Sequence, residues 1–335
     1  MLKVGLIGCG GMGSVHANGW IALKDRVQIV AIADPREEKA KAFAEQTGAR
    51  LYPNGEALLE HEQVDVVDIC TPTFLHTRYA VAAMEKGASV FCEKPVCLTR
   101  QEAELLLKTQ EKTGAKVQVG QVIRFWDEYR YVKHAVENGT FGKVLSGVFA
   151  RLSPKPKWAW EDWFNDYKRS GSVALDLHIH DVDFIRYLMG GEPDRFHTTC
   201  TRDDEGVIQQ IFTSFEYGKA VFTAEGCWDF PDNYPFSMAF CIKFEKATVV
   251  FHSDQNLTVY PADGEAFQPE LDKMYAEEKD SGINVSNQGA YVNELSFFVD
   301  YVTKGVKEEI APLSEGVKSV LLVLDEADAA GGIKI

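Results

Sequence analysis

The sequence predicts an α/β protein with two domains. The first is a doubly wound parallel sheet over residues 1–122, and the second is an α+β domain with a large, mostly antiparallel sheet over residues 123–335. A chain of 335 residues suits two domains better than one. Short runs rich in Val and Ile alternate with helical segments up to residue 122. From 195 to 260 polar and apolar residues mostly alternate, which is typical of antiparallel strands.

The predicted strands of the first domain are apolar throughout, so both faces of the sheet should be buried. These runs are 2–8, 27–34, 64–71, 88–95 and 116–122. Helical segments lie between them, at 12–24, 36–48, 75–87 and 99–114. Several end at glycine, which is frequent at helix C-termini. The alternation of strand and helix predicts right-handed crossovers, and therefore a parallel sheet with helices on both faces.

The second domain has a different pattern, with longer strands and fewer helices between them. A helix at 127–139 and a strand at 143–151 precede a loop rich in aromatic and basic residues. The remaining segments are a helix at 172–190, strands at 207–218, 219–228 and 236–251, and helices at 289–305 and 313–330. The neighbouring strands predict hairpins.

The net charge argues against two classes of partner. The formal charge is −15 and the pI is near 5.0, so neither nucleic acid nor an anionic membrane should attract the protein. No run of eighteen apolar residues predicts a membrane span, and the N-terminal segment resembles no secretory leader. The seven cysteines are odd in number and include no C-x-x-C, which favours reduced thiols and a cytoplasmic protein.

A glycine-rich turn follows the first strand. It reads 8-GCGGMG-13, with Gly8, Gly10 and Gly13 in the spacing G-x-G-x-x-G directly before a helix. Such a turn lets the backbone approach a pyrophosphate, whose charge lies at the helix N-terminus. Gly11 and Met12 complete the turn. In this context the motif predicts a Rossmann domain that binds a dinucleotide, whereas the glycines alone would be a weak signal.

Asp34 is the residue that should select the cofactor. It ends the second strand, 21 residues past Gly13, where a carboxylate can accept hydrogen bonds from both ribose hydroxyls. A 2′-phosphate would meet this carboxylate as a like charge, so NAD is favoured over NADP. Arg36 argues in the other direction, for NADP, because a guanidinium could hold a 2′-phosphate. Its alternative interpretation is a solvent-facing charge in the first turn of a helix.

Further motifs follow the later strands, where ligands of open α/β sheets bind. They read 71-TPTFLH-76, 93-EKP-95 and 120-GQVIRF-125. Together with the N-terminal glycine motif and 171-GSVALDLHIHD-181, they resemble the glucose-fructose oxidoreductase/inositol dehydrogenase (Gfo/Idh/MocA) family over the whole chain. One departure is Ser172, which stands where that family usually has a second glycine. Serine is itself a good helix N-cap, so we expect little consequence.

The resemblance implies which residues bind the cofactor and substrate in the first domain. Lys94 would be the active-site lysine, and a cis peptide bond would precede Pro95. A cation beside the reacting oxygen stabilises an alkoxide-like transition state. The other residues that the resemblance places along the cofactor are Thr71, Pro72, His76, Glu93 and Gln121. His76 could equally be a satisfied histidine that caps its helix.

The segment 172–190 raises the question of a metal, because it holds two histidines and several acids. On a helix, Asp176 and His180 are four residues apart and share a face, whereas His178 points about 200° away from Asp176. A metal site would need the two histidines to converge, so we expect no metal. A solvated charged face is the other alternative, and it would account for Asp181 and Asp183.

The resemblance assigns Asp176 and His180 to a constellation with Lys94. His180 would accept the hydroxyl proton, because imidazole titrates near neutral pH. Asp176 would orient the substrate or the imidazole. Hydride would pass to the nicotinamide, so that the protein supplies position and proton transfer while the cofactor supplies the redox chemistry.

The loop at 151–169 contains three of the six tryptophans and several cations. By resemblance it borders the substrate, and Trp160 and Trp163 suit the C–H face of a sugar ring, while a cation could meet a carboxylate or phosphate. The alternative is a loop whose aromatic residues pack between the domains. Arg124 is a further substrate candidate, because it follows the last strand of the first sheet.

These features predict an NAD-dependent dehydrogenase acting on a sugar, a cyclitol or a sugar derivative. One alternative is a glycoside hydrolase that uses NAD for transient oxidation followed by elimination. Another is a non-catalytic dinucleotide-binding sensor, although the presence of Lys94, Asp176 and His180 weighs against it. We also expect a homodimer or homotetramer formed through the second sheet, whose outer face would carry Val207, Ile211, Val221 and Phe240.

Overall fold

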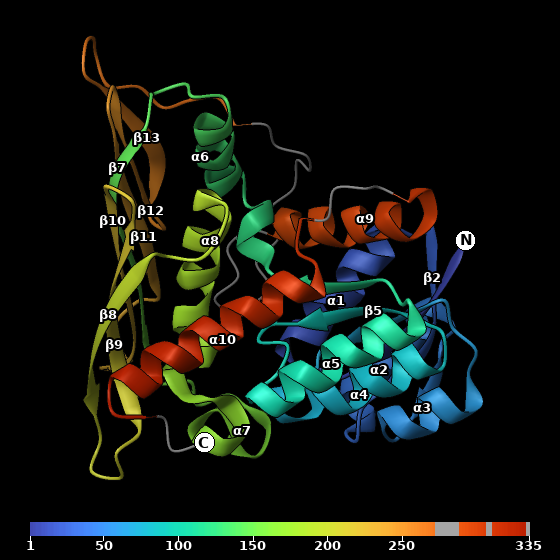
Figure 1. Ribbon diagram of the computed structural model, residues 1–335. Coiled ribbons are helices and arrows are strands. Elements are labelled where there is room, and N and C mark those ends of the chain that lie inside the picture. Colours follow the sequence, from blue (N-terminus) through green and yellow to red (C-terminus); the bar gives the residue numbers. More distant parts are fainter. Residues whose placement is uncertain (272–287, 306–309, 333–335) are drawn as a thin grey trace. The chain divides into compact units, whose positions relative to one another are not determined.

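The structure is a computed structural model that describes residues 1–271, 288–305 and 310–332 (Figure 1). The chain divides into two compact units, Met1–Phe125 with Met274–Lys318, and Trp126–Lys273 with Ser319–Ile335. This differs from a single boundary after residue 122, because a C-terminal segment returns to the first unit. Among the described residues, no helix has the length and apolarity needed to cross a membrane.

The first unit contains the predicted parallel sheet, with six strands in the order β3-β2-β1-β4-β5-β6. The strands are β1 (Leu2–Ile7), β2 (Val27–Ala33), β3 (Arg50–Tyr52), β4 (Val66–Ile69), β5 (Ser89–Glu93) and β6 (Val117–Gly120). Every pair of neighbours is parallel. All four residues of β4 and of β6 are buried, as expected for a sheet covered on both faces. β3 has no counterpart among the predicted strands, because its three residues, two of them exposed, carry too little periodicity.

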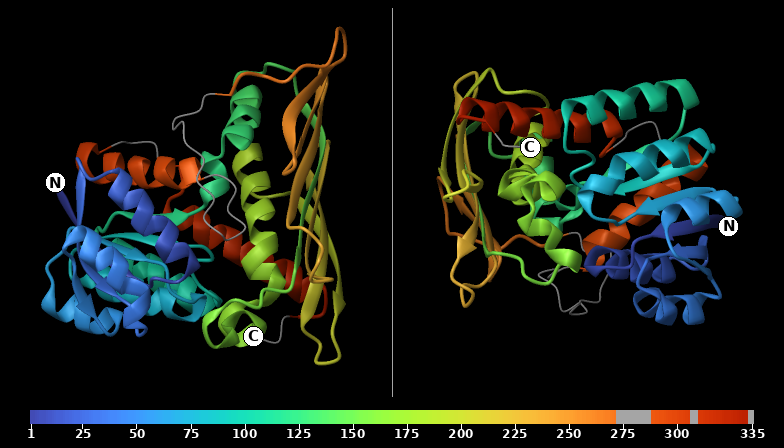
Figure 2. Two further views of the ribbon diagram at one scale, coloured as in Figure 1. Left: turned by 180° about the vertical axis from the view of Figure 1, so that it is seen from behind. Right: turned by 90° about the horizontal axis from the view of Figure 1, so that it is seen from below.

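Helices cover both faces of this sheet (Figures 1 and 2). They are α1 (Gly11–Ala22), α2 (Glu37–Thr47), α3 (Gly55–His61), α4 (His76–Glu85), α5 (Arg100–Thr113) and α9 (Gln288–Lys304). The short 3-10 turns η1 (Thr73–Leu75) and η2 (Val122–Phe125) follow β4 and β6. Leu295 and Phe298 of α9 share one buried core with Trp20 of α1 and Val4 of β1. This packing, which no local pattern indicates, is why α9 belongs to the first unit.

The second unit contains a seven-stranded sheet in the order β13-β12-β11-β7-β10-β9-β8. Its strands are β7 (Val144–Pro154), β8 (Arg195–Arg202), β9 (Ile208–Tyr217), β10 (Ala220–Phe230), β11 (Ser237–Phe244), β12 (Ala247–His252) and β13 (Gln255–Pro261). All pairs are antiparallel except β7 with β10, which confirms the mostly antiparallel prediction. The run at 236–251 is two strands, because Glu245 and Lys246 form a turn between β11 and β12.

One face of this sheet is covered by helices (Figures 1 and 2). The helices of the second unit are α6 (Asp127–Glu137), α7 (Tyr167–Ser170), α8 (Ile179–Met189) and all but the first turns of α10 (Leu313–Ala329). Tyr129 of α6 lies 4.7 Å from Phe184 of α8 and 5.1 Å from Phe240 of β11, measured between ring centroids. Edge-to-face aromatic contacts of this kind hold the helices on the sheet.

The opposite face of the sheet is not covered by any helix of the described residues. Val148, Phe212 and Val221 are exposed on it. Two of the residues predicted for this face are instead in the core, since Ile211 and Phe240 are buried against the helices. That part of the prediction is wrong, because an alternating strand does not reveal which of its two faces points inward.

The acids of α8 form buried contacts and no solvated face, so that alternative is wrong. Asp181 is fully buried and accepts hydrogen bonds from the Arg151 guanidinium at 2.9 and 3.2 Å. Asp183 is also fully buried and accepts a hydrogen bond from Ser319 at 2.7 Å. Removing one partner of such a pair leaves an uncompensated buried charge.

The cysteines are all free thiols, as predicted. Five of them are buried, including Cys92 and Cys97 on either side of the Glu93–Pro95 motif. Burial raises the pKa of the Cys92 and Cys97 thiols well above the ordinary range, so they pack as small apolar side chains and are poor nucleophiles.

Candidate functional site

The glycine turn after β1 packs so tightly on neighbouring backbone that it leaves no room for a side chain at two of its glycines. Gly8 has a φ of +96°, and a Cβ on it would lie 2.6 Å from the Cys70 carbonyl oxygen. A Cβ on Gly13 would lie 1.9 Å from the Gly8 carbonyl oxygen. Gly10 is the N-cap residue of α1, and no side chain of the described residues caps that helix. The first N–H groups of α1 are therefore left for another acceptor, such as a phosphate.

Asp34 lies directly after β2 and is 5% exposed. Its carboxylate accepts hydrogen bonds from the Cys9 backbone N–H at 2.8 Å and from the Arg36 backbone N–H at 2.9 Å. The Arg36 guanidinium binds both carboxylate oxygens, at 3.0 and 3.1 Å. Arg36 is therefore paired with Asp34, and its interpretation as a merely solvent-facing charge is wrong.

Polar side chains without hydrogen-bond partners gather where β4 and β6 end. Within the described part of the chain, buried Thr71 Oγ1 and both amide atoms of buried Gln121 have no partner. Such groups are costly unless a water or ligand satisfies them. Pro72 lies beside Thr71 and is the N-cap residue of η1. This edge of the sheet is therefore suited to a polar ligand.

His76 is the first residue of α4 and is buried. Its Nδ1 lies 2.8 Å from the Pro95 carbonyl oxygen, and its Nε2 lies 2.8 Å from the Thr71 carbonyl oxygen. Burial lowers the pKa of His76, although the two carbonyl contacts oppose that shift. Both ring nitrogens thus lie beside backbone carbonyls, so His76 joins two strand-end loops and does not cap its helix as the alternative expected.

Lys94 follows β5, and the Lys94–Pro95 peptide bond is cis, as expected from the resemblance. The Glu93 carboxylate accepts a hydrogen bond from the Lys94 backbone N–H at 3.1 Å. Arg124 of η2 is buried and donates to the Ile310 carbonyl oxygen, so at least part of its guanidinium has a structural role. Lys94 itself is partly exposed.

The residues at this edge fit a nicotinamide dinucleotide. The turn of Gly8–Gly13 and the uncapped start of α1 suit a pyrophosphate, and Asp34 suits a ribose. Thr71 after β4 and Gln121 after β6 offer unused hydrogen-bonding groups on the strands either side of β5, which Lys94 follows.

In the second unit, the segment that follows Gly171 begins with an unusual backbone. Ser172 is buried and has a φ of +61°, the left-handed region that favours glycine. Its hydroxyl lies 3.5 Å from the Ala174 N–H, which is a weak contact for a cap. The left-handed backbone at Ser172 therefore explains why a glycine suits this position. The capping contact is too weak to be the main role of the residue here.

The predicted helix at 172–190 begins as a π-helical turn, η4 (Ala174–His178), and continues as α8. His178 is fully buried, its Nε2 lies 2.7 Å from the Glu326 carboxylate, and it packs against Gly226 of β10. Asp176 and His180 are each partly exposed. The two histidines therefore have different surroundings, as the helical register predicts. π-helical turns are frequent at functional sites.

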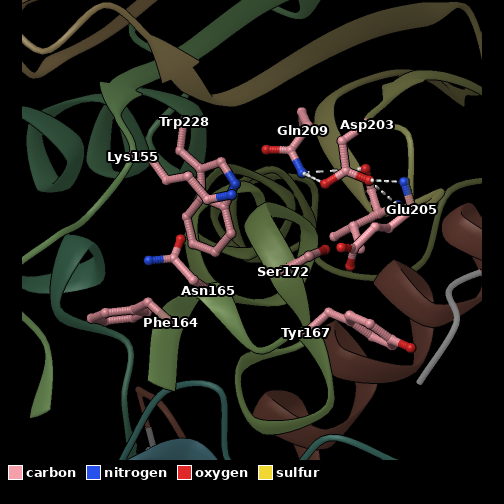
Figure 3. Close-up of a pocket in the computed structure, with 10 residues that line it drawn as sticks. Lys155, Phe164, Asn165, Tyr167, Ser172, Asp203, Glu205, Gln209 and Trp228 are labelled. Carbon is pink, nitrogen blue, oxygen red and sulfur yellow. Dashed lines mark hydrogen bonds between the residues drawn. The ribbon is translucent and has the colours of Figure 1, made fainter. Parts of the chain in front are cut away.

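The loop after β7 lines a cavity of about 200 Å³ that lies entirely within the second unit (Figure 3). Its lining residues include Lys155, Asn165, Tyr167, Gln209 and Trp228, which combine aromatic faces with donors and acceptors. Asp203 and Glu205 also line it. The Lys155 side chain has no hydrogen bond or ion pair within the described ranges. A mixed set of donors and acceptors suits a polyhydroxylated ligand better than a purely anionic one.

The tryptophans predicted for the substrate, Trp160 and Trp163, are not among the residues that line this cavity. Trp163 stacks on Phe164 at 3.9 Å between ring centroids, and the Arg169 guanidinium lies 6.0 Å from the Trp160 ring. Phe164 in turn contacts Trp228 of β10, with centroids 6.4 Å apart. Sequence reasoning missed Trp228 and Gln209, because both sit on strands far along the chain from the loop.

Sequence reasoning also missed a cluster in the first unit. His16, Asp68 and Cys70 are buried, and their potential ligand atoms lie within 4.8 Å of one another. In the described residues, this is the one group with the composition and spacing of a possible metal site. Only its contacts in three dimensions reveal it, since His16 and Asp68 are 52 residues apart.

Comparisons with known proteins agree with this architecture. Residues 2–121 match a family model described as "Oxidoreductase family, NAD-binding Rossmann fold" (GFO_IDH_MocA), and residues 129–250 match "GFO/IDH/MocA C-terminal domain". A myo-inositol 2-dehydrogenase of Thermotoga maritima is 29% identical over 96% of this chain and 94% of its own length.

Two solved structures have the same fold. A putative myo-inositol dehydrogenase of Sinorhizobium meliloti is 25% identical, with a TM-score of 0.80 over 99% of this chain and 98% of that one. A levoglucosan dehydrogenase, solved in complex with NADH and levoglucosan, has a TM-score of 0.82 at 22% identity, over 98% of this chain and 97% of that one. These relatives support the predicted class, a nicotinamide-dependent dehydrogenase acting on CH–OH groups. With both domains matched in order along one chain, the protein belongs to the GFO/IDH/MocA family of oxidoreductases.

Proposed function

We propose that the protein is an NAD-dependent dehydrogenase that interconverts a hydroxyl and a carbonyl on a sugar, a cyclitol or a derivative of one. The observation that carries this proposal is the common edge of the first sheet. The glycine turn after β1 and Lys94 after β5 both lie at the carboxyl ends of strands in one parallel sheet. A dinucleotide held by the turn can extend along that edge towards a substrate beside Lys94.

Oxidation of an alcohol must dispose of one hydride and one proton. When bound, the nicotinamide supplies the hydride acceptor. Lys94, as a cation, lowers the energy of the developing alkoxide. His180 accepts the hydroxyl proton, and Asp176 orients the substrate or the imidazole and stabilises its positive charge. In the reverse direction His180 returns the proton to the new hydroxyl.

For the substrate class, the relatives are named for inositol and levoglucosan. The cavity beside the β7 loop supports a related ligand here, because aromatic faces suit C–H surfaces of a ring while Lys155, Asn165 and Gln209 suit its hydroxyls. We infer that this cavity contributes to the choice of substrate.

A screen of sugars, cyclitols and uronates, followed by NADH absorbance at saturating NAD, tests the proposal. Formation of NADH with at least one compound is the expected result. Release of sugar from glycosides without net NADH would replace the proposal with the transient-oxidation glycosidase. Dinucleotide binding without turnover of any compound or glycoside would favour the sensor.

Cofactor choice can be tested directly. We expect NAD to bind at least about tenfold more tightly than NADP, a difference of about 1.4 kcal/mol. A 2′-phosphate would meet the Asp34 carboxylate, and Arg36 would have to leave that carboxylate to hold the phosphate. Titration of both cofactors by intrinsic fluorescence measures the ratio of the Kd for NADP to the Kd for NAD.

Asp34→Ala should lower this ratio, while Asp25→Ala, at an exposed site in the same unit, should not. Tighter binding of NADP by the wild type would show that Arg36 dominates.

We further propose that the open face of the seven-stranded sheet pairs with a second copy of the chain. Val148 is 56% exposed and Val221 is 42% exposed on neighbouring parallel strands, so both present apolar side chains on this open face. The solution mass at micromolar concentration should be that of a dimer or tetramer. Val148→Glu should shift it towards the monomer, whereas Leu105→Glu, at an exposed leucine of α5, should not. A monomeric wild type would refute this assembly.

A further inference from the structure

A buried polar cluster lies behind Lys94 in the core of the first unit. It consists of His16 on α1, Asp68 of β4, Cys70 just after β4, Glu93 at the end of β5 and Glu294 on α9. His16, Asp68 and Glu294 are 0% exposed. Carboxylates are rarely buried in such number, so the cluster calls for a physical explanation.

The His16 ring links two of these carboxylates. Its Nδ1 lies 3.0 and 3.1 Å from the two Asp68 oxygens, and its Nε2 lies 3.0 Å from Glu93 Oε1. An ionised carboxylate can only accept hydrogen bonds, so both ring nitrogens must carry protons if both acids are ionised. The geometry is therefore that of an imidazolium held between Asp68 and Glu93.

The surrounding charges support this protonation state. Burial lowers the pKa of His16, but the charge of Asp68 and the contact with Cys70 outweigh burial, so the pKa of His16 is well above its ordinary value. Burial, together with the charge of Glu93, raises the pKa of Glu294 well above its ordinary value. Neither Glu294 oxygen has a hydrogen-bond partner in the described part of the chain, as suits a neutral acid better than an ion.

The cluster reaches the active-site lysine through Glu93. One oxygen of Glu93 contacts His16, while the other accepts the backbone N–H of Lys94 at 3.1 Å. The carboxylate occupies the space beside Gly120 that a side chain would fill, since a Cβ on Gly120 would lie 2.9 Å from Glu93 Oε1. His76, whose Nδ1 lies 2.8 Å from the Pro95 carbonyl oxygen, is a further titratable group that the charge of Lys94 affects.

We propose that His16, held by Asp68, is a positioning residue for Lys94. The imidazolium fixes the Glu93 carboxylate and partly neutralises it, and that carboxylate in turn fixes the backbone and sets the local charge at Lys94. This proposal rests on the proposed function, because it gives the cluster a role in the step that Lys94 assists.

The alternative occupant of the cluster is a metal ion bound by His16, Asp68 and Cys70. The hydrogen bonds weigh against it, because Asp68 Oδ2 already accepts the Trp20 indole N–H at 2.6 Å and both ring nitrogens of His16 face carboxylates. Elemental analysis of the purified protein should find no stoichiometric metal. One metal per chain, lost in Cys70→Ser, would overturn the proposal.

Asp68→Asn is the informative variant. Asparagine can still accept the Trp20 N–H, but it favours a neutral His16, which leaves Glu93 with less compensation. We expect kcat to fall about 10–100-fold, as is typical when a group that orients a site residue is changed, with the KM for NAD nearly unchanged. Glu93→Gln should lower kcat similarly, and the double variant should be little worse than either single one, because both act through one imidazole.

The matched control is Asp65→Asn. Asp65 also accepts a backbone N–H, that of Lys3 at 2.7 Å, but it lies at the opposite end of β4. The kcat and KM of Asp65→Asn should match those of the wild type. A wild-type kcat in Asp68→Asn, or strictly multiplicative losses in the double variant, would overturn the proposal.

A second readout is independent of turnover. The pH midpoint for labelling of Lys94 by an amine-reactive reagent, followed by mass spectrometry of the protein without cofactor, reports the charge beside the lysine. The midpoint should rise in Asp68→Asn, where Glu93 is less compensated, and fall in Glu93→Gln, where the carboxylate charge is gone.

Unchanged midpoints in both variants would reject the proposal. A wild type that turns over no substrate but shows these opposite shifts would refute the proposed function and leave the charge coupling intact. If Asp68→Asn is recovered only as aggregate, the labelling midpoint of Glu93→Gln tests the proposal by itself. That midpoint must fall, and a midpoint that does not fall rejects the proposal.

Discussion

His180→Ala should lower kcat by about 10²–10⁴-fold, the usual cost of removing a general base, and should leave the affinity for NAD nearly intact. The reason is that imidazole titrates near neutral pH and so suits a general base better than the Asp176 carboxylate, while Lys94 already carries a proton when it acts as a cation. Steady-state kinetics at saturating NAD, together with a fluorescence titration of NAD, separates the two effects.

His178→Ala is the control for His180→Ala, and the structure changes what to expect from it. From the sequence alone, a residue that faces away from the site should matter little. His178 is fully buried and bonded to Glu326, so its loss should cost about 1–3 kcal/mol of stability and lower Tm. The kcat of the folded variant should stay close to that of the wild type. A severe loss of kcat in His178→Ala with a mild loss in His180→Ala would show that the assignment of the two histidines is wrong.

Lys94→Ala should lower kcat at least as much as His180→Ala, because it removes the cation that stabilises the developing alkoxide. It should also weaken NAD binding, since Lys94 is proposed to lie between cofactor and substrate. Single-turnover hydride transfer and NAD titration measure these two effects separately.

Lys108→Ala is the matched control for the loss of a lysine. Lys108 is an exposed residue of α5 paired with Glu104, so its removal should change neither kcat nor NAD affinity. If Lys94→Ala retained more than about a tenth of the wild-type kcat, Lys94 would have only a minor part in the chemical step.

Some features of this protein were determined by the sequence alone, because their cause is local. The Val- and Ile-rich runs correspond to β1, β2, β4, β5 and β6, since burial on both faces leaves a continuous apolar pattern. The positive φ at Gly8 and the absence of space at Gly13 follow from the steric demands of one tight turn. The placement of Asp34 after β2 likewise needs only the end of one strand. The family motifs added the cis bond before Pro95, which no periodicity could indicate.

Other features were decided only by tertiary structure, because they depend on residues far apart in the chain. The inward face of β9 and β11 was assigned wrongly at Ile211 and Phe240, since alternation marks two faces without saying which one the helices cover. The burial of Asp181 depends on Arg151, a residue of another element. From sequence alone a charged residue is expected to be solvated, because its partner is not known. The His16 cluster and the return of α9 to the first unit have the same origin. Packing brings together groups separated by 30 residues or more, and local sequence carries no record of such contacts.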